Sequence, residues 1–150
     1  MIKARILLFS LLLAASSALL AQSGNAKLID WKFLAKVKFE DKYYPEYEAW
    51  YLYPVFPEEI KALDGKQVII KGYMIPMDVE DGMFALSAYP FSNCFFCGGA
   101  GPESVMTIKF KGSHRKHKTD DVVTMVGTLK LNNSNLEEFN YVLENASEVK

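Results

Sequence analysis

The stretch that decides the fold is Lys66-Gln67-Val68-Ile69-Ile70-Lys71-Gly72-Tyr73, which begins the most regular part of the chain. β-Branched residues fill its centre, and they favour extended strands because branched side chains pack well on a pleated sheet. The run ends at a glycine, which in a strand marks a bend or a close approach of two backbones. The pattern therefore predicts a strand that bends at Gly72.

Four further strands are predicted toward the C-terminus. They are Met83 to Ala88, Val105 to Phe110, Val122 to Leu131, and Asn140 to Leu143 continued by Ala146 and Val149. The strand from Val122 to Leu131 carries Gly127 where a barrel strand would bend. Short strands separated by turns, two of them with a glycine, are typical of small barrels. We therefore predict a mainly β fold, a small OB-like five-stranded barrel.

The N-terminal half supplies shorter elements. Leu28 to Val37 is a short element, helical or extended, and Phe56 to Leu63 reads as a short helix that ends at Asp64-Gly65. Tyr43 to Pro54 is dense in aromatic residues. The aromatic stretch Tyr43 to Phe56 either stacks on a ligand such as a glycan or a nucleobase or covers one end of the barrel. Cover is favoured, because a small barrel needs an additional element at an open end and Tyr and Trp keep their polar tips in water there.

The first 21 residues are typical of a secretory signal peptide. Lys3 and Arg5 precede an uncharged, leucine-rich run of about 15 residues, shorter than the roughly 20 that span a bilayer, and small residues follow. We predict cleavage after Ala21, a periplasmic location, no stable membrane insertion after cleavage, and one OB-like domain over residues 22–150.

Charge and motifs exclude several functions. Without residues 1–21 the chain keeps 15 basic and 18 acidic residues, a net charge of −3, which disfavours nonspecific binding to nucleic acid. The sequence contains no Gly-x-Ser-x-Gly elbow, no His-Glu-x-x-His and no phosphate-binding Gly-x-x-x-x-Gly-Lys. A non-enzymatic role is therefore favoured over catalysis.

Both cysteines lie in one motif, Cys94-Phe95-Phe96-Cys97, followed by Gly98-Gly99-Ala100-Gly101-Pro102. Two intervening residues allow both sulfurs to hold one metal ion or to close a small disulfide ring. The glycines disfavour a helix and suit tight turns with positive φ. A redox site would need a charged or helical environment that stabilises a thiolate, and the sequence around the pair shows neither.

His114 and His117 are the only histidines, and with the cysteines they make a Cys2His2 zinc site conceivable by count. The two residues between them are fewer than the usual three to five, and Arg115, Lys116 and Lys118 would repel a cation. Zinc bound through the cysteines would need other ligands, whereas copper(I) accepts fewer soft donors. The expected cofactor is thus unknown, with zinc and copper as candidates.

Three stretches resemble the DUF3299 family of exported bacterial proteins: Leu63 to Pro76, Asn93 to Pro102 and Val126 to Leu129. The resemblance runs from about Trp31 to Val149. Many members carry Cys-x-His or a similar pair before a proline-rich turn, whereas this chain has Cys-Phe-Phe-Cys before glycines and resembles the form found in Bacteroidetes. Some relatives are encoded beside ABC-type transport components linked to zinc, which implies an accessory of metal traffic.

Together these observations predict a periplasmic, non-enzymatic binding or accessory module, metal-related through Cys94 and Cys97 and working with an ABC-type envelope transporter. The first alternative is a thiol-disulfide redox protein that uses the same two cysteines. The second is a purely structural interaction protein in which a Cys94–Cys97 disulfide clamps the loop after the second predicted strand.

Overall fold

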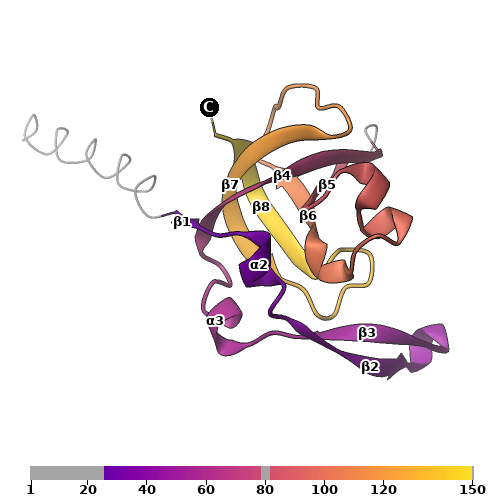
Figure 1. The fold of residues 1–150 in the computed structure, drawn as a ribbon. Coiled ribbons are helices and arrows are strands. Elements are labelled where there is room, and N and C mark those ends of the chain that lie inside the picture. The colour runs from indigo at the N-terminus through magenta and orange to yellow at the C-terminus, as the bar shows by residue number, and fades with distance from the viewer. Residues whose placement is uncertain (1–25, 79–81, 150) are drawn as a thin grey trace, which may run out of the picture.

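The computed structural model describes residues 26–78 and 82–149, and its centre is a closed barrel of five strands (Figure 1). The strands are β4 (Gln67–Asp78), β5 (Met83–Ser87), β6 (Val105–Phe110), β7 (Asp121–Leu131) and β8 (Tyr141–Glu148). They lie in the order β4-β5-β6-β8-β7, and β7 pairs back onto β4 to close the barrel. Among the pairs of these five strands, only β6–β8 is parallel. The predicted OB-like fold is confirmed, and the predicted signal peptide lies outside the described residues.

Two glycines let the barrel strands approach closely, as the sequence indicated. A Cβ atom added at Gly72 would lie 2.7 Å from the carbonyl oxygen of Ser87 on β5. At Gly127 it would lie 2.8 Å from the carbonyl oxygen of Glu144 on β8, where the β7–β8 register shifts. Both distances are below ordinary van der Waals contact, so a larger residue would force the strands apart.

Two short helices contribute to the core at one end of the barrel. They are α2 (Trp31–Leu34), whose first turn is capped by Asp30, and α3 (Glu58–Lys61). Leu34 and Ile60 are fully buried among the side chains of the barrel interior. The buried Tyr141 hydroxyl donates a hydrogen bond of 2.7 Å to the Leu34 carbonyl oxygen. The N-terminal element is completed by β1 (Lys27–Leu28), which pairs in parallel with β4.

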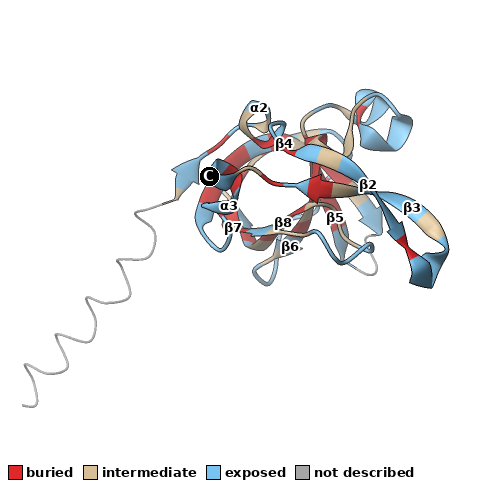
Figure 2. Cartoon of the chain, turned by 90° about the horizontal axis from the view of Figure 1, so that it is seen from below, coloured by how far each residue is buried: buried red, intermediate tan, exposed pale blue. Residues whose placement is uncertain are grey.

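The aromatic stretch forms a separate antiparallel hairpin of β2 (Lys38–Tyr44) and β3 (Ala49–Val55), joined by the 3-10 turn η1 (Pro45–Tyr47). The hairpin extends past the barrel, and most of it is exposed (Figures 1 and 2). Trp50 is 67% exposed and Leu52 is 54% exposed. The predicted cover of a barrel end is limited to the end of the stretch, where Phe56 is 6% exposed and packs on Tyr141 in the core, 5.6 Å between ring centroids. No helix among the described residues has the length and hydropathy of a membrane span.

Candidate functional site

The cysteine motif lies in a segment of three 3-10 turns between β5 and β6. The turns are η2 (Phe91–Asn93), η3 (Phe95–Cys97) and η4 (Pro102–Ser104). Cys94 packs with Ile75, Ala85 and Val105 in a small apolar cluster separate from the main core. This cluster explains why Phe84, Ala85 and Leu86, consecutive on β5, are all buried.

The two sulfurs have different environments. Cys94 is fully buried and its Sγ donates to the Phe91 carbonyl oxygen at 3.0 Å, whereas Cys97 is exposed. Both are free thiols in this structure. The Cys94 contact uses the thiol hydrogen, so any reaction that replaces this hydrogen with a metal or a second sulfur must break the contact first.

Backbone hydrogen bonds fix the turn around the cysteines. The amides of Cys97 and Gly99 donate to the Cys94 carbonyl oxygen at 3.2 and 3.1 Å. Gly98 has a φ of +72°, the left-handed conformation that glycine adopts at low cost, and a Cβ at Gly99 would lie 2.6 Å from the Asn93 carbonyl oxygen. The glycines thus allow a tight turn that holds the two cysteines close in space without a bond between the sulfurs.

A four-coordinate zinc site does not form from these residues. Within residues 26–78 and 82–149, no group of three or more His, Cys, Asp or Glu side chains is arranged to hold a metal ion. The cysteines and the two histidines therefore do not constitute a Cys2His2 centre in the described structure. The thiols alone fit a soft ion that accepts few ligands, or one whose remaining ligands come from another molecule.

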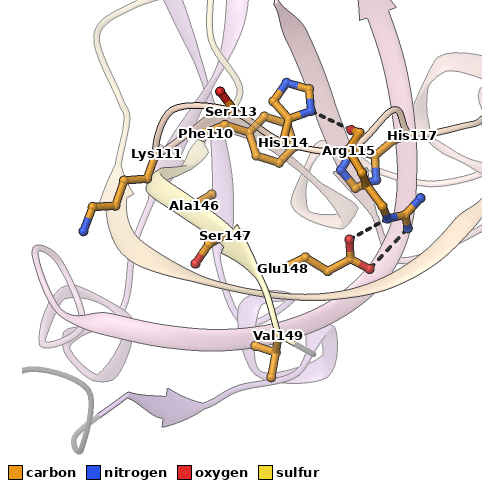
Figure 3. A pocket seen from close by; sticks show the side chains of 10 residues that line it. All are labelled: Phe110, Lys111, Ser113, His114, Arg115, His117, Ala146, Ser147, Glu148 and Val149. Carbon is orange, nitrogen blue, oxygen red and sulfur yellow. Dashed lines mark hydrogen bonds and ion pairs between the residues drawn. The ribbon is translucent and has the colours of Figure 1, made fainter.

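The histidines instead line a pocket of about 430 Å³ between the β6–β7 loop and the end of β8 (Figure 3). The His114 ring stacks on Phe110 with centroids 3.8 Å apart, and the His117 ring lies nearly parallel to Phe110 at 5.4 Å. The two imidazoles are 5.7 Å apart and stacked, so they pack face to face rather than converging on one ion.

Arg115 ties this loop to two strands. It donates to Glu148 Oε2 at 2.7 Å and to Asp121 Oδ2 at 2.8 Å. The hydrogen bond from Arg115 helps to hold the pKa of the Glu148 carboxyl below its usual range. The pKa of the Asp121 carboxyl is also lowered, first by the hydrogen bond from the Lys118 amide and second by the hydrogen bond from Arg115. Of the positive charges that the sequence showed near the histidines, that of Arg115 is thus compensated by two carboxylates.

His117 is the buried polar residue of the loop. Burial, with a smaller contribution from Arg115, lowers the pKa of its imidazole, which favours the neutral ring. Its Nδ1 atom is buried and has no hydrogen-bond partner. The ring is held by packing against Phe110 and Phe84, which gives the histidines a structural role that accounts for their position without a metal.

Comparisons with known proteins agree with the fold. No family model matches the chain, and no curated protein matches its sequence. A solved structure of a DUF3299 family protein from Pseudomonas aeruginosa PAO1 is similar, with a TM-score of 0.53 and 18% sequence identity over 85% of this chain and 98% of that chain. At this identity the likeness shows a shared fold.

Sequence reasoning raised ligand stacking for the aromatic stretch but did not locate its site, a cleft between the hairpin and the loop 132–140. Its walls include Trp50 and Tyr51 of the hairpin, Phe95 of the cysteine motif and Phe139 of the loop. The aromatic density of Tyr43 to Pro54 was the available signal. Sequence reasoning favours packing there because a small barrel needs an element at an open end, whereas in the structure α2 and α3 contribute buried side chains to the core.

Proposed function

We propose that this chain is an exported, non-enzymatic binding or accessory module of the DUF3299 kind, which handles a soft metal ion through Cys94 and Cys97 in the cell envelope. Its partner in this proposal is an ABC-type transporter. Support for the family comes from the sequence resemblance and from the shared fold with the solved DUF3299 protein. Support for periplasmic location comes from the leader-like residues 1–21.

The observation that carries the proposal is a pair of unbonded thiols, separated by two residues, on one turn. Thiolate sulfur is the donor that copper(I) and zinc prefer among protein ligands. Cys97 is exposed and can meet an incoming ion, and Cys94 joins it once its contact with Phe91 breaks. A turn with two sulfur donors suits an ion that is received and passed on, because a partner protein can supply the remaining ligands of the metal ion.

Metal titration of the reduced, purified protein tests this proposal. Copper(I) should bind with one ion per chain, and zinc should bind more weakly, because zinc lacks two of its four ligands here. Cys94→Ser and Cys97→Ser should each abolish the site. The double variant His114→Ala/His117→Ala should bind as the wild type does. Metal binding that survives loss of either cysteine would contradict the proposal.

A thiol-disulfide function is the second candidate. The difference in exposure between the two cysteines supports it. An exposed thiol beside a buried one suits an attacking and a resolving sulfur. Reduction of insulin disulfides by the purified protein, lost in Cys97→Ser, would support this function. A protein that neither binds metal nor reduces insulin would leave the structural clamp as the remaining alternative.

A further inference from the structure

A cleft of about 420 Å³ separates the β2–β3 hairpin from the barrel. Trp50 and Tyr51 of the hairpin line one side, Phe95 of the cysteine motif another, and the loop that joins β7 to β8 the third. Figure 1 shows this loop, drawn in yellow, next to the hairpin. The cleft therefore lies between the barrel and an element added outside it.

The polar lining of this cleft is almost entirely uncharged. Asn133, Ser134, Asn135 and Asn140 contribute amide and hydroxyl groups. The one charged residue is Glu138, whose carboxylate forms an ion pair with Lys109 at 2.5 Å. Three other pockets on the described residues each include a lysine or an arginine, and this cleft has neither.

Ring surfaces make up much of the remaining lining. Trp50 is 67% exposed and Tyr51 is 37% exposed, so their surfaces reach solvent. Phe95 and Phe139 also line the cleft, with ring centroids 6.0 Å apart in an edge-to-face pair. Trp50, Tyr51 and Phe95 thus leave apolar ring surface in water at one cleft, and a ligand that covers these rings would remove that surface from water.

The walls are connected by side-chain hydrogen bonds. Asn133 Nδ2 donates to the Tyr53 hydroxyl at 2.9 Å, which links the loop to the hairpin. Asn132 holds the loop itself, because its Nδ2 donates to the Asn135 carbonyl oxygen at 2.7 Å and its Oδ1 accepts from the Asn135 amide at 2.9 Å. The lining is thus largely preformed, which lowers the ordering cost of binding.

We propose that this cleft binds a neutral oligosaccharide. A sugar ring has an apolar face of C–H groups that packs on aromatic rings, and a rim of hydroxyls that pairs with amide and hydroxyl side chains. Anionic ligands find no free cation in the cleft. The hairpin carries two lysines and four acidic residues, so an anionic membrane or a nucleic acid is repelled.

The test uses tryptophan fluorescence, because Trp50 and Trp31 are the only tryptophans in the chain. In a Trp31→Phe background, the purified protein is titrated with cellotetraose, chitotetraose and maltotetraose. We expect at least one of them to change the Trp50 emission saturably with millimolar or tighter affinity. A sulfated tetrasaccharide of the heparin type should not compete.

Variants assign the binding to the cleft, with affinities measured by calorimetry. Trp50→Ala and Asn135→Ala should each weaken binding, Trp50→Ala by about tenfold or more, the scale of one lost ring contact. Tyr89→Ala is the matched control, since Tyr89 is a 48% exposed aromatic residue that does not line the cleft. Cys97→Ser should also bind normally, which separates this proposal from the metal site.

Three results would overturn the proposal. The first is no response to any of the three neutral sugars up to about 10 mM, above the range of a weak specific site. The second is binding that Trp50→Ala and Asn135→Ala leave unchanged. The third is preferential binding of the sulfated sugar that weakens with salt, which would identify a charged surface elsewhere.

Discussion

The barrel and the hairpin use the same alternating strand pattern with opposite results. On β4, Val68, Ile70 and Met74 are fully buried inside the barrel. On β3, Trp50 and Leu52 occupy equivalent alternate positions and remain more than half exposed. Closure of the barrel, not the pattern, decides the difference, because the hairpin has no second sheet against which to pack. The barrel therefore carries the stability, and the segments outside it are free to carry function.

The largest contrast is expected between matched apolar truncations in the two regions. Ile60→Ala removes a fully buried side chain from the barrel core and should cost about 2 to 5 kcal/mol of unfolding free energy. Leu52→Ala on the hairpin should stay within about 0.5 kcal/mol. Urea unfolding of both variants checks this. Equal losses would show that the hairpin belongs to the stabilising core.

The next largest loss of stability is expected from a methyl group added at Gly127, where β7 and β8 approach closely. Gly127→Ala would place a Cβ 2.8 Å from the Glu144 carbonyl oxygen and should destabilise the protein by about 1 to 3 kcal/mol. Val122→Ala on the same strand, at a 53% exposed side chain, should change stability by less than about 0.5 kcal/mol. Thermal unfolding distinguishes them, and a neutral Gly127→Ala would argue against close strand packing there.

A smaller loss is expected from the hydrogen bond between α2 and the barrel. Tyr141→Phe keeps the buried ring but leaves the Leu34 carbonyl oxygen without its 2.7 Å partner, which should cost roughly 1 to 2 kcal/mol. Burial raises the pKa of the Tyr141 hydroxyl, so the donor stays protonated throughout the neutral range. Hydrogen exchange of the α2 amides should accelerate in the variant. Unchanged exchange and stability would mean that the bond does not hold the helix.

The smallest effect is a pH dependence localised to the β6–β7 loop. The pKa of His117 is lowered in the folded state, so below about pH 6.5 the unfolded chain binds the proton more readily and stability falls as pH decreases. The lowered pKa values of Glu148 and Asp121 add a further loss below about pH 4. His117→Phe should remove the first decline in urea unfolding across pH. A decline that persists in that variant would assign it to another group.

The sequence allowed prediction of the barrel because its strands satisfy local rules. Three local signals predict the same five-stranded barrel. They are the β-branched runs, the glycines at 72 and 127, and the turn residues between strands. The position of Cys94 beneath its own turn was not predictable, because burial there depends on β5 being covered on its outer face by η2 and η3. The cleft beside Trp50 was missed for a related reason. The cleft forms where the hairpin, the cysteine motif and the β7–β8 loop come together. These segments are distant in sequence, so no local sequence pattern predicts their contact.

The central claim is that the cysteine turn outside the barrel strands binds a metal ion, and the chemical state of the two thiols tests this claim most directly. We would isolate the protein from a bacterial envelope without chelator or reductant, then record native and denaturing intact mass beside a thiol titration. The account predicts a bound metal in the native spectrum and two thiols that react only after the metal is stripped. A chain lighter by two hydrogens, with no free thiol, would contradict it and establish a Cys94–Cys97 disulfide instead.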